Sequence, residues 1–309
     1  MSNILLRRRM LMQAGGSPTP SIPEGALPFP FSVSPTKQVY FSKGNLQWSA
    51  TGGTATPTTH ATADGGVGEG TWRFAENQWD TVGNASMGNV YGVGGDMTVK
   101  CNNANVGQNY QGWIDIFGWG TSGYSAPPYL VSQNNSDYVN GNIPIVGTNY
   151  DWGIYNAISN GGNQPGLWRT LSVSDINYLL NTRVTLSGVR YAKGNINGID
   201  GLFIVPDNWD TSIYTFINVN TQSDAYSNVV SVSDYHTYLL PNGVAFMKSY
   251  GVIRLNNVNP GRNDGFYWLI DNYNASSSYY YRIYSTWMAV DKNPKHFGWE
   301  VRLVMDYTD

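Results

Sequence analysis

The chain has 309 residues, enough to bury a sizeable core in one large or two smaller domains. Only 13% of the residues are charged, whereas glycine (35) and tyrosine (22) are abundant, which excludes a long helical bundle and favours strands, turns and long loops. The net charge of −3 leaves Arg7, Arg8 and Arg9 as an isolated basic triplet, so we expect no nucleic-acid partner.

The first thirty residues predict an arm and a tether. Residues 1–12 are basic and apolar, and residues 15–30 are rich in proline, which favours an extended backbone. We interpret residues 1–30 as an arm whose arginine triplet anchors the protein to a particle, although a tail without function is an equally open alternative. The arm lacks the apolar run of about 7–15 residues that a secretory signal needs, and no run of about 20 apolar residues predicts a membrane span. We therefore expect a protein made in a host cytoplasm, without an export signal and without a membrane partner.

The body, residues 31–309, begins with alternating patterns that are typical of short strands. These strands are predicted at 31–35, 38–41 and 45–48. A stretch rich in Thr, Ala and Gly, residues 51–70, predicts a long surface loop. Because its loops are long, the part 31–150 could form a separable β-rich unit.

Two short helices are predicted where the tetrapeptide Ser-Val-Ser-Asp occurs, at 172–175 and 231–234. The serine can accept a hydrogen bond from the third helical N–H, and the aspartate can reach back to the first residue. Apolar residues follow at helical spacing, namely Ile176, Leu179 and Leu180, and then Tyr235, Tyr238 and Leu239. Two independent uses of a good cap explain the repeat more simply than an internal duplication. Further strands are predicted at 184–187, 189–192, 201–206 and 214–219.

Several segments together resemble the C-type-lectin-like fold, and more narrowly its sulfatase-modifying branch. They are 167–180, 202–209, 265–268 and 298–304. The segments 31–48 and 72–80 are similar to surface proteins of gut Bacteroidales and of their crAss-like phages. The resemblance implies an α+β body over residues 31–305, β-rich with two short helices and long loops. It also implies use in display and recognition, in phage fibres and bacterial adhesins.

The residues that carry chemistry do not predict an enzyme or a cofactor. Sulfatase-modifying enzymes work through a pair of cysteines, whereas this chain has only Cys101, which is also too few for a disulfide or a structural zinc site. The acidic segment 207–210 lacks the tripeptides of calcium-dependent lectins, and a turn explains it better than a metal site. The histidines lack ligand spacing, and the neighbouring acids are too generic to define a glycosidase pair. These residues are His60, His236 and His296, and Glu69, Glu76 and Asp80.

Aromatic side chains provide the predicted binding surface. Three tryptophans are expected in the core because large aromatic residues are highly buried on average: Trp113, Trp119 and Trp152. The tyrosines and serines of 272–281 cannot all face inward from a strand with a period of two residues, and such residues make adaptable contacts. The resemblance places recognition residues of phage lectin-like proteins in this region. The predicted contact residues are Tyr273, Tyr279, Tyr281, Tyr284 and Trp287.

Together these features predict a non-enzymatic virion protein of a bacteriophage, a head or tail fibre subunit. The arm would contact capsid or tail proteins, and the lectin-like body would bind a host-surface glycan or another fibre protein. We expect a homodimer or homotrimer, because avidity compensates for weak single-site carbohydrate contacts. Two alternatives stay open, a surface adhesin of a Bacteroidales bacterium and a purely structural capsid decoration or adaptor.

Overall fold

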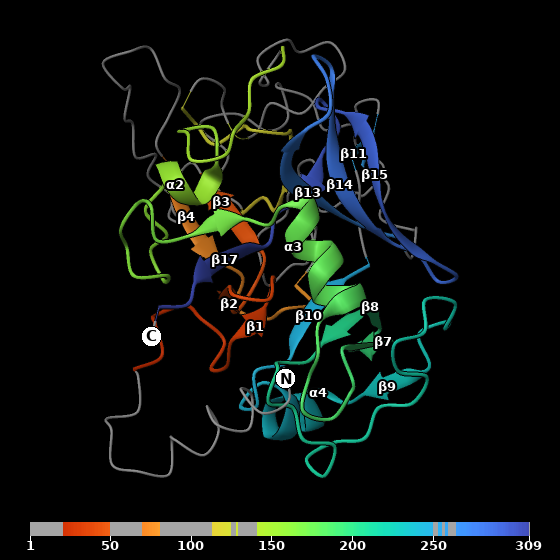
Figure 1. Ribbon diagram of the computed structural model, residues 1–309. Coiled ribbons are helices and arrows are strands. Elements are labelled where there is room, and N and C mark those ends of the chain that lie inside the picture. The colour runs from red at the N-terminus through yellow and green to blue at the C-terminus, as the bar shows by residue number, and fades with distance from the viewer. Residues whose placement is uncertain are drawn as a thin grey trace.

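The computed structural model describes residues 21–49, 70–80, 113–124, 128, 141–249, 253–254, 257–258 and 264–308. The chain is β-rich with few short helices, 34% strand against 11% helix, which agrees with the expected α+β class. Figure 1 shows the strands gathered into several separate sheets, with short helices beside them. The arginine triplet, the predicted loop 51–70, Cys101, His60 and Glu69 lie outside the described residues, apart from Gly70 at the end of that loop.

One sheet joins the beginning of the body to its end. Its strands, in the order β1-β2-β17-β6, are β1 (Phe31–Ser32), β2 (Gln38–Phe41), β17 (Leu303–Asp306) and β6 (Arg169–Thr170). β17 is antiparallel to both of its neighbours, with Val304 opposite Phe41 and Leu303 opposite Thr170. The predicted strands 31–35 and 38–41 are thus confirmed in position, although the first is shorter than expected.

A five-stranded sheet is buried on both faces. Its order is β15-β14-β13-β16-β5, for β15 (Met288–Pro294), β14 (Ser277–Ile283), β13 (Gly265–Asn272), β16 (Trp299–Glu300) and β5 (Ile116–Phe117). Alternate residues of β13 point to opposite faces. Phe266 and Trp268 enter one core cluster, which also contains the expected core residues Trp119 and Trp152, whereas Tyr267 enters a second cluster. The first cluster is called here the tryptophan core.

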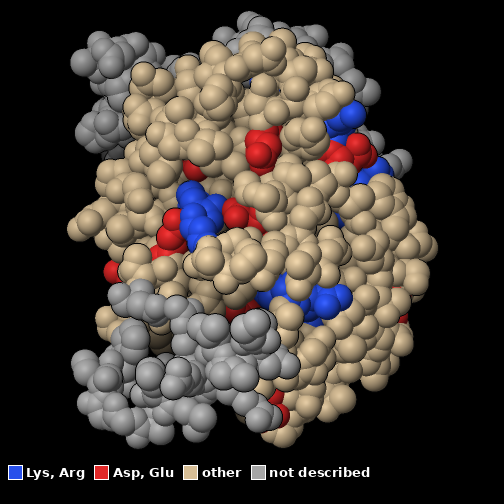
Figure 2. All heavy atoms as spheres, viewed as in Figure 1, with Lys and Arg blue, Asp and Glu red and all other residues tan. Residues whose placement is uncertain are grey.

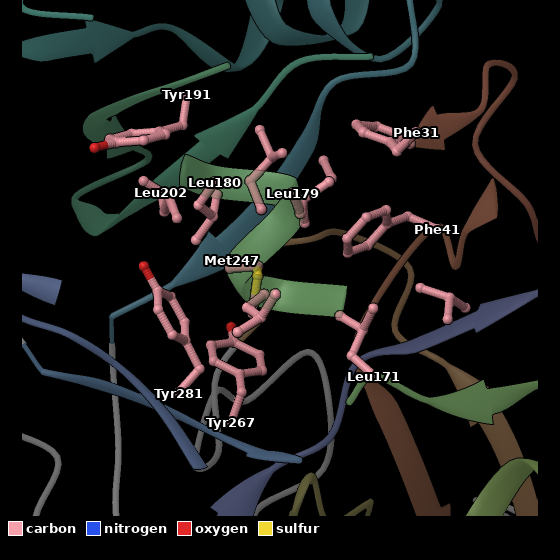
Figure 3. Packing of buried hydrophobic residues seen from close by; sticks show 14 of the residues in the cluster. Phe31, Phe41, Leu171, Leu179, Leu180, Tyr191, Leu202, Met247, Tyr267 and Tyr281 are labelled. Atoms are coloured by element: carbon pink, nitrogen blue, oxygen red, sulfur yellow. The ribbon is translucent and has the colours of Figure 1, made fainter. Parts of the chain in front are cut away.

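A four-stranded sheet is also packed against a core cluster on each of its two faces. It has the order β10-β8-β7-β9, for β10 (Ala245–Lys248), β8 (Ile199–Ile204), β7 (Tyr191–Ile196) and β9 (Asn228–Val230). Leu202 and Met247 share the second cluster with Tyr267, so this cluster lies between the two sheets and is called the central core (Figure 3). Phe203 and Phe246 face a third cluster on the other side. Both sheets therefore lack a fully solvated face. Two short pairs complete the strands, β3 (Leu46–Ser49) with β4 (Thr71–Phe74) and β11 (Ile253–Arg254) with β12 (Asn257–Val258).

Both predicted helix starts are confirmed. Helix α3 (Val173–Asn177) begins after Ser172, which forms a complete capping box with Asp175, and it continues as the π-helix η2 (Tyr178–Thr182). Helix α4 (Val232–Asp234) begins after Ser231, whose side chain accepts from the backbone N–H of Asp234, and continues as η3 (Tyr235–Leu239). A third helix, α2 (Trp152–Tyr155), is capped by Asp151 and was not predicted. Among the described residues, no helix has the length and apolar character needed to cross a bilayer.

The apolar residues of the helices are buried as predicted, with one exception. Ile176, Leu179 and Leu180 all enter the central core, where Figure 3 labels Leu179 and Leu180. Tyr235 and Leu239 enter the third cluster. The exception, Tyr238, is 43% exposed. The i→i+5 hydrogen bonds of η3 widen the turn, so a residue three positions after Tyr235 no longer lies on its face.

Two predicted strands are wrong. Residues 184–187 form a loop and turn in which Val184 and Leu186 are about half exposed. Residues 214–219 form an irregular segment that bends at 217–218, where Asn218 has a positive φ of 50°, a left-handed conformation that a strand does not contain. Phe216 of this segment is nevertheless buried in the third cluster, which explains the hydrophobic pattern.

The described end of the predicted linker, residues 21–30, packs on the body. The Leu27 side chain lies in the central core, and its N–H donates to the carbonyl of Phe41 at 2.8 Å. The Lys43 N–H donates to the carbonyl of Gly25 at 2.8 Å. Residues 31–150 likewise share sheets with later parts of the chain, through β2 with β17 and β5 with β16.

Candidate recognition surface

One group of predicted contact residues lies at the tip of the β13–β14 hairpin. The rings of Tyr273 and Tyr279 meet edge to face with centroids 5.5 Å apart, and Lys292 Nζ lies 4.2 Å from the centre of the Tyr273 ring. Tyr279 and Lys292 are opposite each other in β14 and β15. A hydrogen bond with Tyr273 raises the pKa of Lys292. Tyr273 is 44% exposed, so this hairpin-tip cluster of Tyr273, Tyr279 and Lys292 presents an aromatic ring braced by a cation.

The local sequence fixes the shape of this tip. The Asn274 side chain accepts from the N–H groups of Ser276 (2.9 Å) and Ser277 (2.8 Å), which closes a tight Asx turn. The loop near residue 141 supports the turn from the side, because the Gly141 N–H donates to the carbonyl of Ala275 at 3.0 Å. Asn272 and Asn142 also meet, at 3.3 Å between side-chain amides. The turn that carries the exposed ring is therefore fixed by asparagine side chains.

A second group lies at the other end of β14. The Arg282 guanidinium carbon lies 3.3 Å from the centre of the Tyr284 ring and 4.9 Å from that of the Trp287 ring. The two rings are 4.7 Å apart, and the Tyr284 N–H donates to the Trp287 carbonyl at 2.8 Å, which closes the turn before β15. Trp287 is 38% exposed. Arg282, Tyr284 and Trp287 are called here the Arg282 cluster.

The structure separates the predicted contact residues into two surfaces. Tyr279 packs against the central core and Tyr284 against the tryptophan core, so they lie on opposite faces of the five-stranded sheet. Five residue steps along the chain also separate them, which corresponds to about 16 Å in an extended strand. A single small ligand cannot bridge both clusters, so each is a candidate contact of its own.

The prediction for Tyr281 is wrong. This residue is only 4% exposed and lies opposite Tyr267 in the central core (Figure 3). Its neighbour Tyr280 is buried on the other face, where its ring stacks on Trp299 with centroids 4.9 Å apart. The prediction assumed that a strand has one buried face, whereas β14 has two. Consecutive tyrosines can therefore all be buried.

Charged side chains are sparse on the face of the molecule that Figure 2 shows. On the face in Figure 2, lysine, arginine and acidic side chains form small separate groups within a surface of neutral residues. Other exposed apolar side chains, such as Tyr238 on η3, lie on different elements. An aromatic ring among neutral polar groups suits ligands that offer an apolar face and many hydroxyl groups, because such rings combine apolar area with adaptable polar contacts.

The residues considered for metal or acid–base chemistry have structural partners. Asp207 lies in the predicted turn and forms a buried ion pair with Arg183 at 3.0 Å. Asp80 accepts from the backbone of Asn77 at 3.0 Å. His236 lies edge to face with Trp79, and His296 with Phe297. Glu76 forms a long ion pair with Arg73 at 3.6 Å. Within the described residues no group of His, Cys, Asp and Glu side chains could hold a metal ion.

The sequence analysis missed one group of charged residues, the buried triad of Lys248, Asp115 and Glu300. The Lys248 ammonium lies 2.6 Å from Asp115 Oδ2 and 2.7 Å from Glu300 Oε1. Burial raises the pKa of Glu300 to about 8 and also raises that of Asp115. Burial opposes the charged form of Lys248, but the two carboxylates together outweigh it and raise the pKa of Lys248. The sequence does indicate that these three charged residues are buried, because each of them adjoins an apolar segment.

No protein-family model matches this chain, and no curated protein or solved structure matches it either. Function is therefore inferred from the residues of this chain. The two exposed clusters at the ends of β14 are the part of the described surface on which contact residues were predicted and aromatic rings are accessible.

Proposed function

We propose that this protein is a non-enzymatic recognition subunit of a bacteriophage particle, a head or tail fibre protein with a C-type-lectin-like body. The N-terminal arm, with Arg7, Arg8 and Arg9, attaches the subunit to capsid or tail proteins. The body faces outward and binds a glycan of the host surface. The subunit acts as a homodimer or homotrimer, since several weak sites on one particle bind together with high avidity.

The observation that supports recognition most directly is the exposure of Tyr273 and Trp287. Each ring is held in place by a neighbouring aromatic ring and a cation, so little conformational freedom is lost when a ligand stacks on it. Tyr273 also lies in the chain between Asn272 and Asn274, whose amide groups can donate to and accept from sugar hydroxyls. The particle location is supported by the sequence resemblance and the basic arm.

Binding to surface polysaccharide tests the recognition proposal. The fluorescently labelled full chain would be titrated against polysaccharide extracted from gut Bacteroidales and against a glycan array. We expect Tyr273→Ala or Trp287→Ala to weaken binding about tenfold, which corresponds to about 1.4 kcal/mol. Tyr238→Ala is the matched control, because Tyr238 is equally exposed but lies on η3. If all three variants bind equally well, neither cluster contacts the glycan.

Particle occupancy tests the location separately. Phage particles that carry the chain without residues 1–12 would be compared with unaltered particles by cryo-electron microscopy. We expect the density of this subunit to disappear. Full occupancy without the arm would refute attachment through it, and finding the protein on bacterial cells instead of particles would favour the adhesin.

A further inference from the structure

The buried triad brings an amine and two carboxyl groups into contact. Lys248 ends β10, Asp115 precedes β5, and Glu300 ends β16, so three different elements supply the three side chains. The Lys248 Nζ atom lies 2.6 Å from Asp115 Oδ2 and 2.7 Å from Glu300 Oε1. All three side chains are 0% exposed. Such distances are those of charge-assisted hydrogen bonds, and they place the Lys248 amine beside the carboxyl group of Asp115.

The triad borders the tryptophan core and also has a polar neighbour, because the hydroxyl of Tyr267 donates to the Lys248 carbonyl at 3.1 Å and forms a hydrogen bond with Glu300. Asp115 lies between Ile114 and Ile116, and Glu300 follows Trp299, all of which belong to the tryptophan core. Asp115 Oδ1 has no hydrogen-bond partner from another described residue. A carboxylate that is buried and only half satisfied is costly to the folded state, and two carboxylates share one lysine here.

We propose that Lys248 and Asp115 condense to an intramolecular isopeptide bond, with Glu300 as the residue that transfers the proton. This covalent modification is independent of the proposed recognition function, because the triad lies inside the body and touches neither exposed cluster.

The reaction balances without any added reagent. A proton first moves within the ion pair, so that Lys248 becomes a neutral amine and Asp115 a carboxylic acid. The Lys248 nitrogen then attacks Asp115 Cγ, and Glu300 accepts the proton that the nitrogen releases. Glu300 returns that proton to a hydroxyl of the tetrahedral intermediate, the C–O bond breaks, and one water molecule leaves. The product is a neutral amide beside an ionised Glu300, with no change in oxidation state.

The raised pKa of Lys248 opposes formation of the neutral amine, whereas three other features of the site favour the reaction. Burial raises the pKa of Asp115, which makes its protonated form more accessible than in water. The raised pKa of Glu300, about 8, suits a group that must both accept and return a proton near neutral pH. Condensation also removes two charges from the protein interior, which relieves the penalty of keeping them buried.

The bond would join parts of the chain that are far apart. Lys248 and Asp115 are 133 positions apart in the sequence; Lys248 ends a strand of the four-stranded sheet, and Asp115 directly precedes β5 of the five-stranded sheet. A covalent link between the two sheets would keep the body closed over the central core after other contacts have been lost.

Mass spectrometry of the full chain under denaturing conditions tests the proposal. We expect a mass lower than that of the sequence by one water molecule. Succinimide formation at Asp200-Gly201 or Asp264-Gly265 would remove the same mass, so the loss must be located by proteolysis. We expect one branched peptide that contains both Lys248 and Asp115. The proposal is overturned if the folded protein has the full mass calculated from its sequence. It is also overturned if the water loss lies at another position in the chain.

Three variants and one internal control sharpen the test. Asp115→Ala is expected to abolish the branched peptide, and Glu300→Gln to slow its formation at least tenfold. Asp115→Asn is expected to give the same bond with loss of ammonia, which a merely structural ion pair would not do. Lys193 is the internal control, because its buried ammonium contacts the carbonyls of Gln222 and Ser285, which cannot condense with it.

If Glu300→Gln forms the isopeptide bond at an unchanged rate, Glu300 is not the residue that transfers the proton. If a variant fails to fold, the wild-type peptide map still decides whether the bond exists.

Discussion

Replacing Arg183 with methionine should strongly destabilise the protein. The guanidinium is fully buried and donates to four acceptors: the carbonyls of Leu179 (3.0 Å), Val205 (2.8 Å) and Arg190 (3.0 Å), and Asp207 Oδ1 (3.0 Å). Asp207 in turn accepts from the backbone and hydroxyl of Ser32. These bonds connect η2, the end of β8 and β1, so Arg183 joins three segments that are distant in sequence.

The expected loss is about 4 kcal/mol of unfolding free energy. Removing one partner of a buried ion pair costs about 3–5 kcal/mol, because the other charge is left buried without compensation. Methionine fills much of the same volume, so little of the loss comes from an empty cavity. The matched control is Lys37→Met, which breaks the ion pair of Lys37 with Asp306 at 2.9 Å. Both side chains of that pair are more than 40% exposed, so the expected loss is below about 1 kcal/mol.

Urea unfolding followed by tryptophan fluorescence measures both changes. The same m-value can be used for all the proteins, because neither substitution changes the surface exposed on unfolding by much. Differences in the midpoint then give differences in the unfolding free energy. If Arg183→Met shifts the midpoint no further than Lys37→Met, the buried network contributes no more than an exposed pair, and the reasoning is refuted.

The remaining predictions concern the helix caps. Ser172→Ala should lower the unfolding free energy by about 1 kcal/mol, and Ser231→Ala by less because that cap is exposed, both measured as urea midpoints. Equal shifts would contradict this order. Burial raises the pKa of Asp151 to about 6, so the folded state holds a proton that the unfolded chain releases near pH 4. The unfolding free energy of the wild type should therefore fall relative to that of Asp151→Asn as the pH rises from 4 to 7, by up to about 3 kcal/mol. If the difference between the two proteins stays constant over this range, the pKa of Asp151 is not raised.

Helix starts were predictable because their determinants are local. Ser172 and Asp175 are three residues apart and satisfy each other's backbone groups, so the sequence alone specifies the cap. The segment 214–219 was mispredicted because Asn218 adopts a left-handed conformation that the hydrophobic pattern does not reveal. The burial of Phe216 produces a strand-like pattern without a strand.

The candidate site was only half predictable. The exposure of Tyr273 and Trp287 follows from their turns, which the neighbouring Asn and Ser residues indicate. The burial of Tyr280 and Tyr281 depends on what covers each face of the five-stranded sheet, and that is decided by segments far away in the sequence. The partners of Lys248 are equally distant, so its apolar neighbours reveal burial but not the two carboxylates.

The position of β17 sets an order of events during synthesis. This strand inserts between β2 and β6, so β2 pairs with a strand that is made much later than β2 itself. On the ribosome, β2 must wait with one edge unpaired until β17 has emerged, and pairing over such a separation is slow. Nascent chains are therefore exposed to edge-to-edge aggregation while the residues between β2 and β17 are made, and a chaperone that covers exposed strand edges would act during this interval.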